Sequence, residues 1–214
     1  MKKIRYTPLQ ILMHIGCLFP LAYLIFDYFT NNLTANPIQD IEKRTGFAAI
    51  TILVLSLSST PINAVFGWRE PLKRRRALGL YAFLYATLHM TVFFAIDYGF
   101  TWSLIIRDVL EKRYIIIGSL SFLLLLPLAV TSFRWWMVKM GKNWKKLHKL
   151  VYLTAPLVVI HFAWSRKGDF FSLQGDVLQP FIYGLIVILL LVLRIPSIKK
   201  AVVSLWTQRL RRAT

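Results

Sequence analysis

The chain has 214 residues, of which 57% are hydrophobic, and a mean hydropathy of +0.55. Soluble domains are about 45–50% apolar, so this composition excludes most soluble folds. Only 17% of the residues are charged, yet the formal net charge is +18. A nucleic-acid-binding protein of this charge would not carry long uncharged apolar stretches. The composition therefore indicates a membrane protein with several spans and no nucleic-acid partner.

Six stretches without central charges approach the roughly 20 residues that cross the hydrocarbon of a bilayer. They cover approximately residues 7–26, 46–67, 77–96, 114–133, 147–165 and 177–194. The last two have short apolar centres, which Lys149 and Arg194 extend by snorkelling. No stretch shows the alternation of a membrane β-strand. We therefore predict an all-α bundle of six transmembrane helices, with residues 1–214 forming one domain, and we find no internal repeat.

Charge alternates along the connecting segments. Twenty of the 27 Lys and Arg residues, with only Glu70 of the nine acids, fall in the two tails and in the second and fourth loops. The other three loops hold the remaining seven basic residues and eight acids. Because positive charge resists translocation, we predict that both termini and these two loops are cytoplasmic.

The single cysteine, Cys17, limits the redox chemistry of the chain. It excludes an intrachain disulfide, a C-x-x-C redox pair and the C-x-x-C-H site for covalently attached haem. No span has an Asp, Glu, Lys or Arg near its middle, which argues against a proton-coupled transporter or a carboxylate-lined cation channel. Histidine is therefore the candidate for chemistry inside the membrane.

All four histidines lie in spans or at their ends. A buried imidazole is costly unless both nitrogens find partners. His89 lies about 18 Å along the third span and His161 about 21 Å along the fifth, so both are expected at one depth near the periplasmic side. Two imidazoles facing each other across a bundle are what a bis-histidine haem requires. The alternative is that each histidine bonds a backbone carbonyl or a Ser or Thr side chain.

An inner site is less complete. His148 lies about 20 Å below His161 on the same helix, with its side chain about 140° away around the axis. The residue that would face it from the third span is Arg75 or Arg76, not histidine. His14 is the other imidazole at that depth and is either the second ligand or structural. The histidines are too widely spread, with too few cysteines, for structural zinc.

The basic run from Lys73 to Arg76 lies against the inner end of the third span. It is suited to a flavin phosphate, haem propionates or anionic lipid headgroups. No G-x-G-x-x-G or P-loop motif occurs, so an electron donor and an electron acceptor would lie outside the chain.

Several motifs resemble a known family over nearly the whole chain. They are Asn36-Pro37-Ile38-Gln39-Asp40, Thr45-Gly46, Arg75-Arg76-Ala77-Leu78-Gly79-Leu80, Ala86-Thr87-Leu88-His89 and, most specific, Trp144-Lys145-Lys146-Leu147-His148-Lys149-Leu150-Val151-Tyr152 followed by His161 and Trp164. The sequence resembles the ferric-reductase-like transmembrane family. Within it, the sequence is similar to the haem-binding membrane subunits of bacterial periplasmic methionine sulfoxide reductase systems.

The resemblance implies a cytochrome b of the bacterial inner membrane that acts as an electron-transfer subunit rather than as the catalytic subunit. It implies electrons from quinone or a cytosolic flavin reductase, delivered to a periplasmic molybdopterin reductase that repairs oxidised methionine. It associates His89, His148 and His161 with one or two b-type haems, and Arg75 and Arg76 with flavin mononucleotide (FMN).

Two other functions remain open from the sequence. One is a stand-alone transmembrane metal reductase that acts on ferric or other extracellular ions. The other is a non-redox membrane transporter or assembly protein, in which the histidines only pack and form hydrogen bonds.

Overall fold

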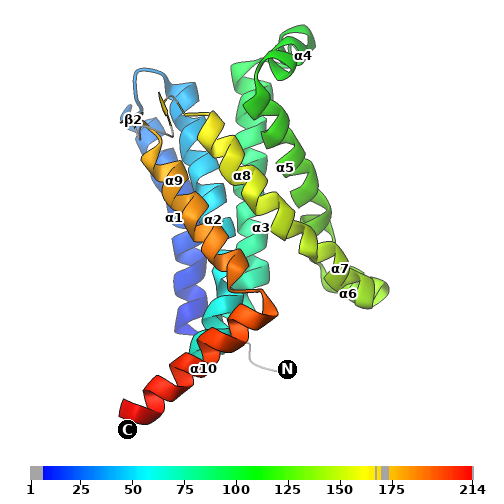
Figure 1. The fold of residues 1–214 in the computed structure, drawn as a ribbon. Helices are drawn as coiled ribbons and strands as arrows, with labels where there is room; N and C mark the ends of the chain where they lie inside the picture. The colour runs from blue at the N-terminus through cyan, green and yellow to red at the C-terminus, as the bar shows by residue number, and fades with distance from the viewer. Residues whose placement is uncertain (1–6, 167, 170–173, 214) are drawn as a thin grey trace.

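A computed structural model describes residues 7–166, 168–169 and 174–213, so the N-terminal tail lies outside the described residues (Figure 1). The regular elements of the described part are helices apart from two paired strands of two residues each, which confirms the predicted all-α class. Its elements are α1 (Pro8–Phe29), α2 (Pro37–Phe66), α3 (Arg69–Thr91), the π-helix η1 (Val92–Asp97), α4 (Trp102–Glu111), α5 (Arg113–Val130), α6 (Arg134–Met140), α7 (Lys142–Leu147), the 3-10 helix η2 (His148–Leu150), α8 (Val151–Trp164), β1 (Gly168–Asp169), β2 (Gln174–Gly175), α9 (Leu178–Val192) and α10 (Pro196–Ala213).

Five helical segments of the described chain are long and apolar enough to cross a membrane. They are α1, α2, α3 with η1, α5, and the segment Lys142–Trp164 that α7, η2 and α8 form together. The predicted sixth span is α9, which has 15 residues and is about 22 Å long. It qualifies only when joined to α10 across a 91° bend. The chain is therefore a multi-pass membrane protein, and its described residues hold five candidate spans, or six if the bent pair is one.

Two helices extend well beyond the apolar stretches that predicted them. The second begins at Pro37 and the third at Arg69, both in charged sequence. Charged side chains mark the edge of the hydrocarbon but do not stop a helix, so helix ends are set by caps instead. Asn36 accepts a hydrogen bond from the Gln39 amide, and Gly67 closes α2 in the left-handed conformation, with φ of 69°.

The long helices pack as two close pairs, α2 with α3 and α5 with α8 (Figure 1). Between and around these pairs, α1 covers α2 and α3, while α9 lies against α8. The most buried span is α2. The start of α1 and the whole of α10 lie at the same end of the bundle (Figure 1).

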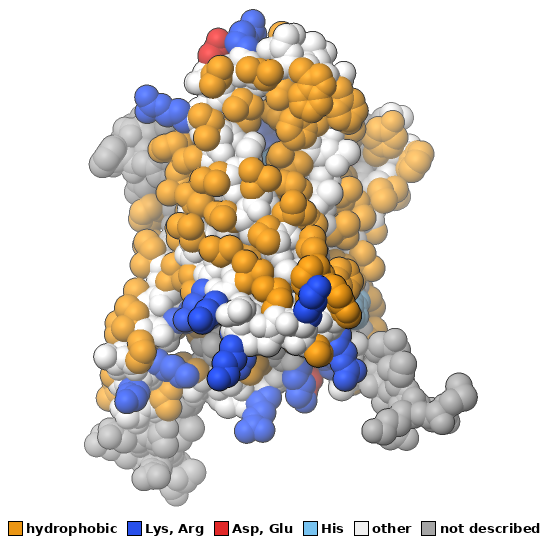
Figure 2. Space-filling view, turned by 90° about the vertical axis from the view of Figure 1, so that its right-hand side faces the viewer, with side chains coloured by type: hydrophobic (Ala, Val, Ile, Leu, Met, Phe, Trp, Pro, Cys, Tyr) orange, Lys and Arg blue, Asp and Glu red, His pale blue; other side chains and the backbone are white. Residues whose placement is uncertain are grey.

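Apolar side chains cover the middle of the molecule on its outside as well as its inside. Figure 2 shows them as a broad band, with many Lys and Arg side chains at the end that carries α10. Leu12, Phe19, Leu123 and Ile188 are among those more than half exposed. Such a surface is costly in water and is what lipid-facing helices present.

Tyr85 of α3 locks α1 in place. Its side chain is 1% exposed, and its hydroxyl donates to the Cys17 carbonyl at 2.7 Å while accepting from the Leu21 amide at 3.0 Å. Cys17 and Leu21 would otherwise bond each other one turn apart in α1. The tyrosine therefore inserts into the hydrogen-bond ladder of the helix, next to Pro20.

Candidate functional site

His89 of α3 and His161 of α8 meet inside the bundle. Their ring centroids are 6.1 Å apart and their planes make an angle of 72°. The two rings come from different spans and lie at one level, as their positions in the sequence predicted.

Each of these histidines is oriented by a backbone carbonyl. Nδ1 of His89 lies 3.0 Å from the Glu42 carbonyl oxygen, and Nδ1 of His161 lies 2.8 Å from that of Tyr114. A carbonyl only accepts, so Nδ1 carries the proton in both rings and Nε2 is left with its lone pair. This arrangement fixes the tautomer and rotation of histidines that bind metals through Nε2.

Two glycines make room for the rings. A Cβ atom added at Gly118 of α5 would lie 2.7 Å from Nδ1 and Cε1 of His161. One added at Gly46 of α2 would lie 3.3 Å from Nδ1 of His89. Any larger residue at Gly118 would therefore displace the imidazole from its present position.

The two histidines line a cavity of about 330 Å³, within the usual size of a ligand pocket. Its walls are largely apolar and include the aromatic side chains of Phe47, Phe93, Phe122 and Phe162. Cationic side chains also line it, namely Lys43, Lys112 and Arg166. We call this the outer cavity, because the charge distribution of the sequence predicts that it lies toward the periplasm.

A small polar cluster borders the outer cavity between η1 and α5. The Asp108 carboxylate accepts hydrogen bonds from the Tyr98 hydroxyl and the Lys112 ammonium group. Lys112, and then Tyr98, hold the pKa of Asp108 below its usual range, while Asp108 raises the pKa of Lys112. Burial, followed by the bond to Asp108, raises the pKa of Tyr98 to about 12. The cluster therefore stays in one charge state at neutral pH.

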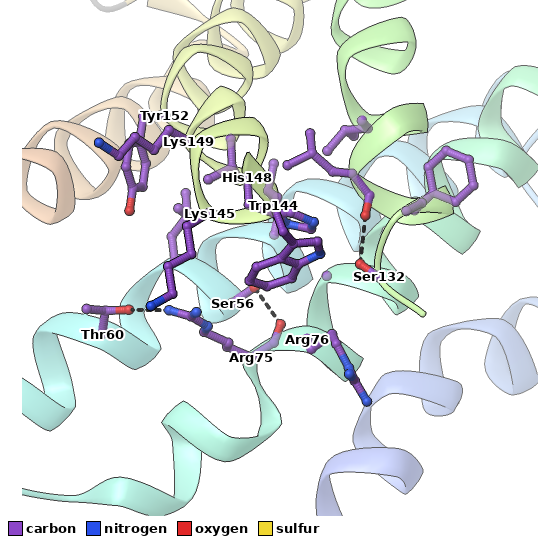
Figure 3. Close-up of a pocket in the computed structure, with 18 of the residues that line it drawn as sticks. Ser56, Thr60, Arg75, Arg76, Ser132, Trp144, Lys145, His148, Lys149 and Tyr152 are labelled. Carbon is purple, nitrogen blue, oxygen red and sulfur yellow. Dashed lines mark hydrogen bonds between the residues drawn. The ribbon is translucent and has the colours of Figure 1, made fainter. Parts of the chain in front are cut away.

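His148 lies in a second cavity, at the other end of the bundle, of about 320 Å³. Its Nε2 is 3.1 Å from Thr131 Oγ1, and its ring lies against Trp144 with centroids 4.0 Å apart (Figure 3). We call this the inner cavity. The structure thus separates His148 from the other two predicted metal ligands.

Cations surround the inner cavity. Arg75, Arg76, Lys145, Lys149 and Arg194 line it. Figure 3 shows Arg75 reaching toward Thr60, to which Nη1 donates at 3.4 Å. Both arginines predicted to bind a cofactor therefore lie at one site with His148.

His14 does not complete that site. Its Nδ1 lies 2.8 Å from the Tyr81 hydroxyl of α3, and its ring meets the edge of the tyrosine ring at 5.7 Å. It does not line the inner cavity. Among the described residues, no three His, Cys, Asp or Glu side chains gather into a group that could hold a metal ion. Within the described residues, His89 and His161 are two histidines whose rings lie next to each other.

Comparison with known proteins places these residues in a family. The model of the ferric reductase like transmembrane component matches residues 44–159. The haem-binding subunit MsrQ of protein-methionine-sulfoxide reductase from Xanthomonas axonopodis pv. citri is 36% identical over 186 residues, covering 84% of this chain and 82% of that protein. The chain belongs to the ferric reductase like transmembrane family.

Other relatives in this family bear the same name. The MsrQ subunits of Herminiimonas arsenicoxydans and Rhodospirillum rubrum are each 36% identical, over 190 and 193 residues. They cover 88% and 89% of this chain, and 85% and 89% of their own lengths. The chain is therefore MsrQ-like within the family, as its motifs indicated.

The structure also reveals a repeat within this ferric-reductase-like domain that inspection of the sequence missed. Both carbonyl-to-histidine contacts span 47 residues. A shift of 72 positions takes Gly46 to Gly118 and His89 to His161. The pair α2 and α3 thus uses the same spacing as the pair α5 and α8. Few identical residues survive between the halves, and the match appears only when the contacts are known.

The two glycines at this candidate site received no role from sequence reasoning: Gly46 entered only as part of a motif, and Gly118 was not singled out. Glycine in a helix interior costs roughly 1 kcal/mol relative to alanine. Gly46 and Gly118 both lie inside helices, where no turn requires them. A glycine inside a helix that no turn explains indicates that another group lies close to the backbone. This was the signal in the sequence.

Proposed function

We propose that this chain is the haem-binding membrane subunit of a methionine sulfoxide reductase system, and that haem b lies between His89 and His161. One observation carries the proposal, the 6.1 Å separation of two imidazole rings whose Nε2 atoms are both left unprotonated. A metal–imidazole bond is about 2 Å long and the ring centre lies about 1 Å behind the nitrogen, so rings sharing one metal have centres about 6 Å apart.

The chain's own residues would each have a part in holding such a group. The carbonyls of Glu42 and Tyr114 orient the two imidazoles, and Gly46 and Gly118 leave space for them. The aromatic walls would pack against a porphyrin, and the three lining cations, which share the cavity with Glu42 and Asp97, would suit acidic substituents such as propionates. Haem b would supply a one-electron iron couple at this position. The residues present therefore fit the group that the names of the MsrQ relatives state.

The direction of electron transfer that we propose rests on the predicted orientation of the chain in the membrane. We place the basic end of the bundle in the bacterial cytoplasm and the outer cavity toward the periplasm, because positive charge resists translocation. Electrons from quinone or a cytosolic flavin reductase would enter at the inner cavity. They would leave from the outer cavity to a periplasmic molybdopterin-containing methionine sulfoxide reductase. The chain would then be an electron-transfer subunit, and its partner the catalytic one.

The inner cavity favours FMN over a second bis-histidine haem. It offers a single imidazole, His148, but five cations and the aromatic side chains of Trp144 and Tyr152. In this proposal Arg75 and Arg76 bind the flavin phosphate, as bidentate guanidinium groups do. Fluorescence of flavin extracted with acid from purified protein tests this. Arg75→Ala and Arg76→Ala should lower the yield, whereas Lys142→Ala, which lies outside the cavity lining, should not.

Haem content tests the proposal as a whole. A pyridine haemochrome assay with protein quantitation gives the haem type and the number per chain. We expect a low-spin b-type spectrum that His89→Ala and His161→Ala largely abolish while the protein still inserts. His14→Ala is the matched control and should keep the spectrum, because His14 bonds Tyr81 away from both cavities. A colourless wild-type preparation from haem-replete cells would contradict the proposal and favour a non-redox protein.

A second assay separates the proposed electron carrier from a stand-alone ferric reductase. Reduction of periplasmic methionine sulfoxide should need both this chain and its periplasmic partner. Reduction of extracellular ferric chelates that persists at full rate without the partner would favour the stand-alone enzyme.

A further inference from the structure

The helix α4 has two chemically different edges. Trp102, Ile106 and Leu110 recur every four residues, so they share one edge, and they are 62, 58 and 74% exposed. Arg107 and Glu111 lie on another edge, form an ion pair at 3.9 Å and are about equally exposed. The exposed apolar edge is therefore not covered by any other described part of the chain.

The rotation of α4 about its own axis is fixed by its buried side. Ile105 is 4% exposed and packs inward. Asp108, 7% exposed, accepts from the Tyr98 hydroxyl before the helix and from the Lys112 ammonium group after it. Both ends of α4 are thus tied to a single carboxylate. The apolar edge points outward as a consequence of these contacts.

The start of α4 lies beside the end of a membrane span. The Phe100 amide donates to the Phe94 carbonyl of η1 at 2.8 Å, and the rings of Trp102 and Phe94 are 6.2 Å apart. Ile96 and Phe100, 52 and 58% exposed, continue the apolar surface at this end. Figure 1 shows α4 beside the ends of α3 and α5, at the opposite end from α10.

We propose that α4 lies in the membrane interface at the end of the bundle that holds His89 and His161, with lipid as its partner. Trp102, Ile106 and Leu110 enter the boundary between headgroups and acyl chains, and Arg107 and Glu111 remain in water. Tryptophan favours this level of a bilayer, and an amphipathic helix lies along it. The proposal depends on the membrane fold and not on haem.

The rim of the outer cavity is connected to α4. Tyr98 and Lys112 both line that cavity and both bond Asp108. A helix held by lipid would therefore hold one side of the cavity rim, through Asp108, at the membrane surface.

Spin labels on full-length protein in lipid nanodiscs test the proposal. Single cysteines replace Ile106 and Leu110 on the apolar edge and, as matched controls, Arg107 and Glu111. Cys17 is buried, and unsubstituted protein labelled in parallel measures its background. Collision rates with oxygen, which partitions into lipid, and with a water-soluble nickel chelate are measured at each position. All four side chains are exposed, so gel filtration should show the wild-type elution.

We expect the ratio of oxygen to nickel collisions to be several-fold higher at Ile106→Cys and Leu110→Cys than at the two controls. Equal ratios dominated by nickel at all four positions would place α4 in water and overturn the proposal. Low rates with both reagents at Ile106→Cys and Leu110→Cys would mean that protein, such as a second copy of the chain, covers this edge. That outcome would also overturn it.

Discussion

The two helix pairs α2–α3 and α5–α8 share one plan but differ at one end. At the outer end each pair supplies a glycine, a carbonyl and a histidine, at equal spacing. At the inner end the shift of 72 positions sets Arg76 of the first pair against His148 of the second. The difference shows how two helix pairs of one plan can form a site with two facing imidazoles at one end and a cationic site with one imidazole at the other.

The largest expected effect comes from filling the glycine positions. Gly118→Ala puts a methyl group 2.7 Å from the present His161 ring, so the imidazole must rotate away and most of the bound haem should be lost. Gly46→Ala meets its histidine at 3.3 Å and should lose less. Gly16→Ala, with nothing within 4 Å, is the control. The haem-to-protein ratio is measured for all three variants. Equal ratios for Gly46→Ala and Gly118→Ala would show that the distance to the imidazole does not determine how much haem is lost.

Adding a second imidazole to the inner cavity tests whether the two helix pairs correspond at their inner end. Arg76→His places histidine at the position that corresponds to His148, in the cavity that both residues line. We expect the haem-to-protein ratio to double, because two imidazoles at one level can clamp a second iron porphyrin. Arg75→His, one position out of register, is the matched control and should leave the ratio unchanged. If the two variants behave alike, the halves do not correspond at the inner end.

A smaller effect, on stability, is expected at a hydrogen-bonding tyrosine that only one of the two helix pairs has. Tyr85 of α3 holds α1, whereas the corresponding residue of α8 is Leu157. In Tyr85→Phe the Leu21 amide and the Cys17 carbonyl regain each other, so we expect the free energy of unfolding in detergent to fall by only about 1 kcal/mol.

Leu157→Ala is a contrasting variant for the same measurement. It removes an apolar side chain from the second half without touching a hydrogen bond. If Tyr85→Phe lowers the free energy of unfolding by several kcal/mol, the Leu21 amide and the Cys17 carbonyl do not form a hydrogen bond with each other in the variant.

The sequence predicted five of the six spans, the sixth only if α9 and α10 form one bent span, and it predicted the facing histidines; the structure shows why it could do so. Hydropathy marks the segments that must lie in lipid, and the rise of a helix turns a position into a depth, so His89 and His161 were correctly expected at one level. Depth alone says nothing about which way a ring points. The carbonyl partners of the rings come from neighbouring helices, and only packing brings them near.

Other features were beyond sequence reasoning for definite physical reasons. The start of α2 depends on the Asn36 cap, and α3 begins at Arg69 without a side-chain cap; both starts lie in charged or polar sequence, which hydropathy does not detect. His14 was a candidate ligand by depth, but its bond to Tyr81 depends on how α1 is rotated against α3. The repeat survives in spacing rather than in residue identity, so it became visible only through two contacts of equal sequence separation.

The smallest expected effect concerns α4, which joins the two halves. The pKa of Asp108 is lowered in the folded protein by Lys112 and Tyr98, so its ion pair stabilises the fold above the ordinary aspartate pKa of about 4. That stabilisation should be lost as the pH falls through the lowered folded value. Thermal unfolding of the protein in detergent, followed from pH 7 downward, should therefore show a decline that Asp108→Asn removes, because asparagine does not titrate. Glu111→Gln on the exposed edge of the same helix is the matched control and should keep the wild-type profile. A decline of equal size in all three proteins would mean that other carboxylates determine acid stability, and that the joint between the halves is not held by this charge.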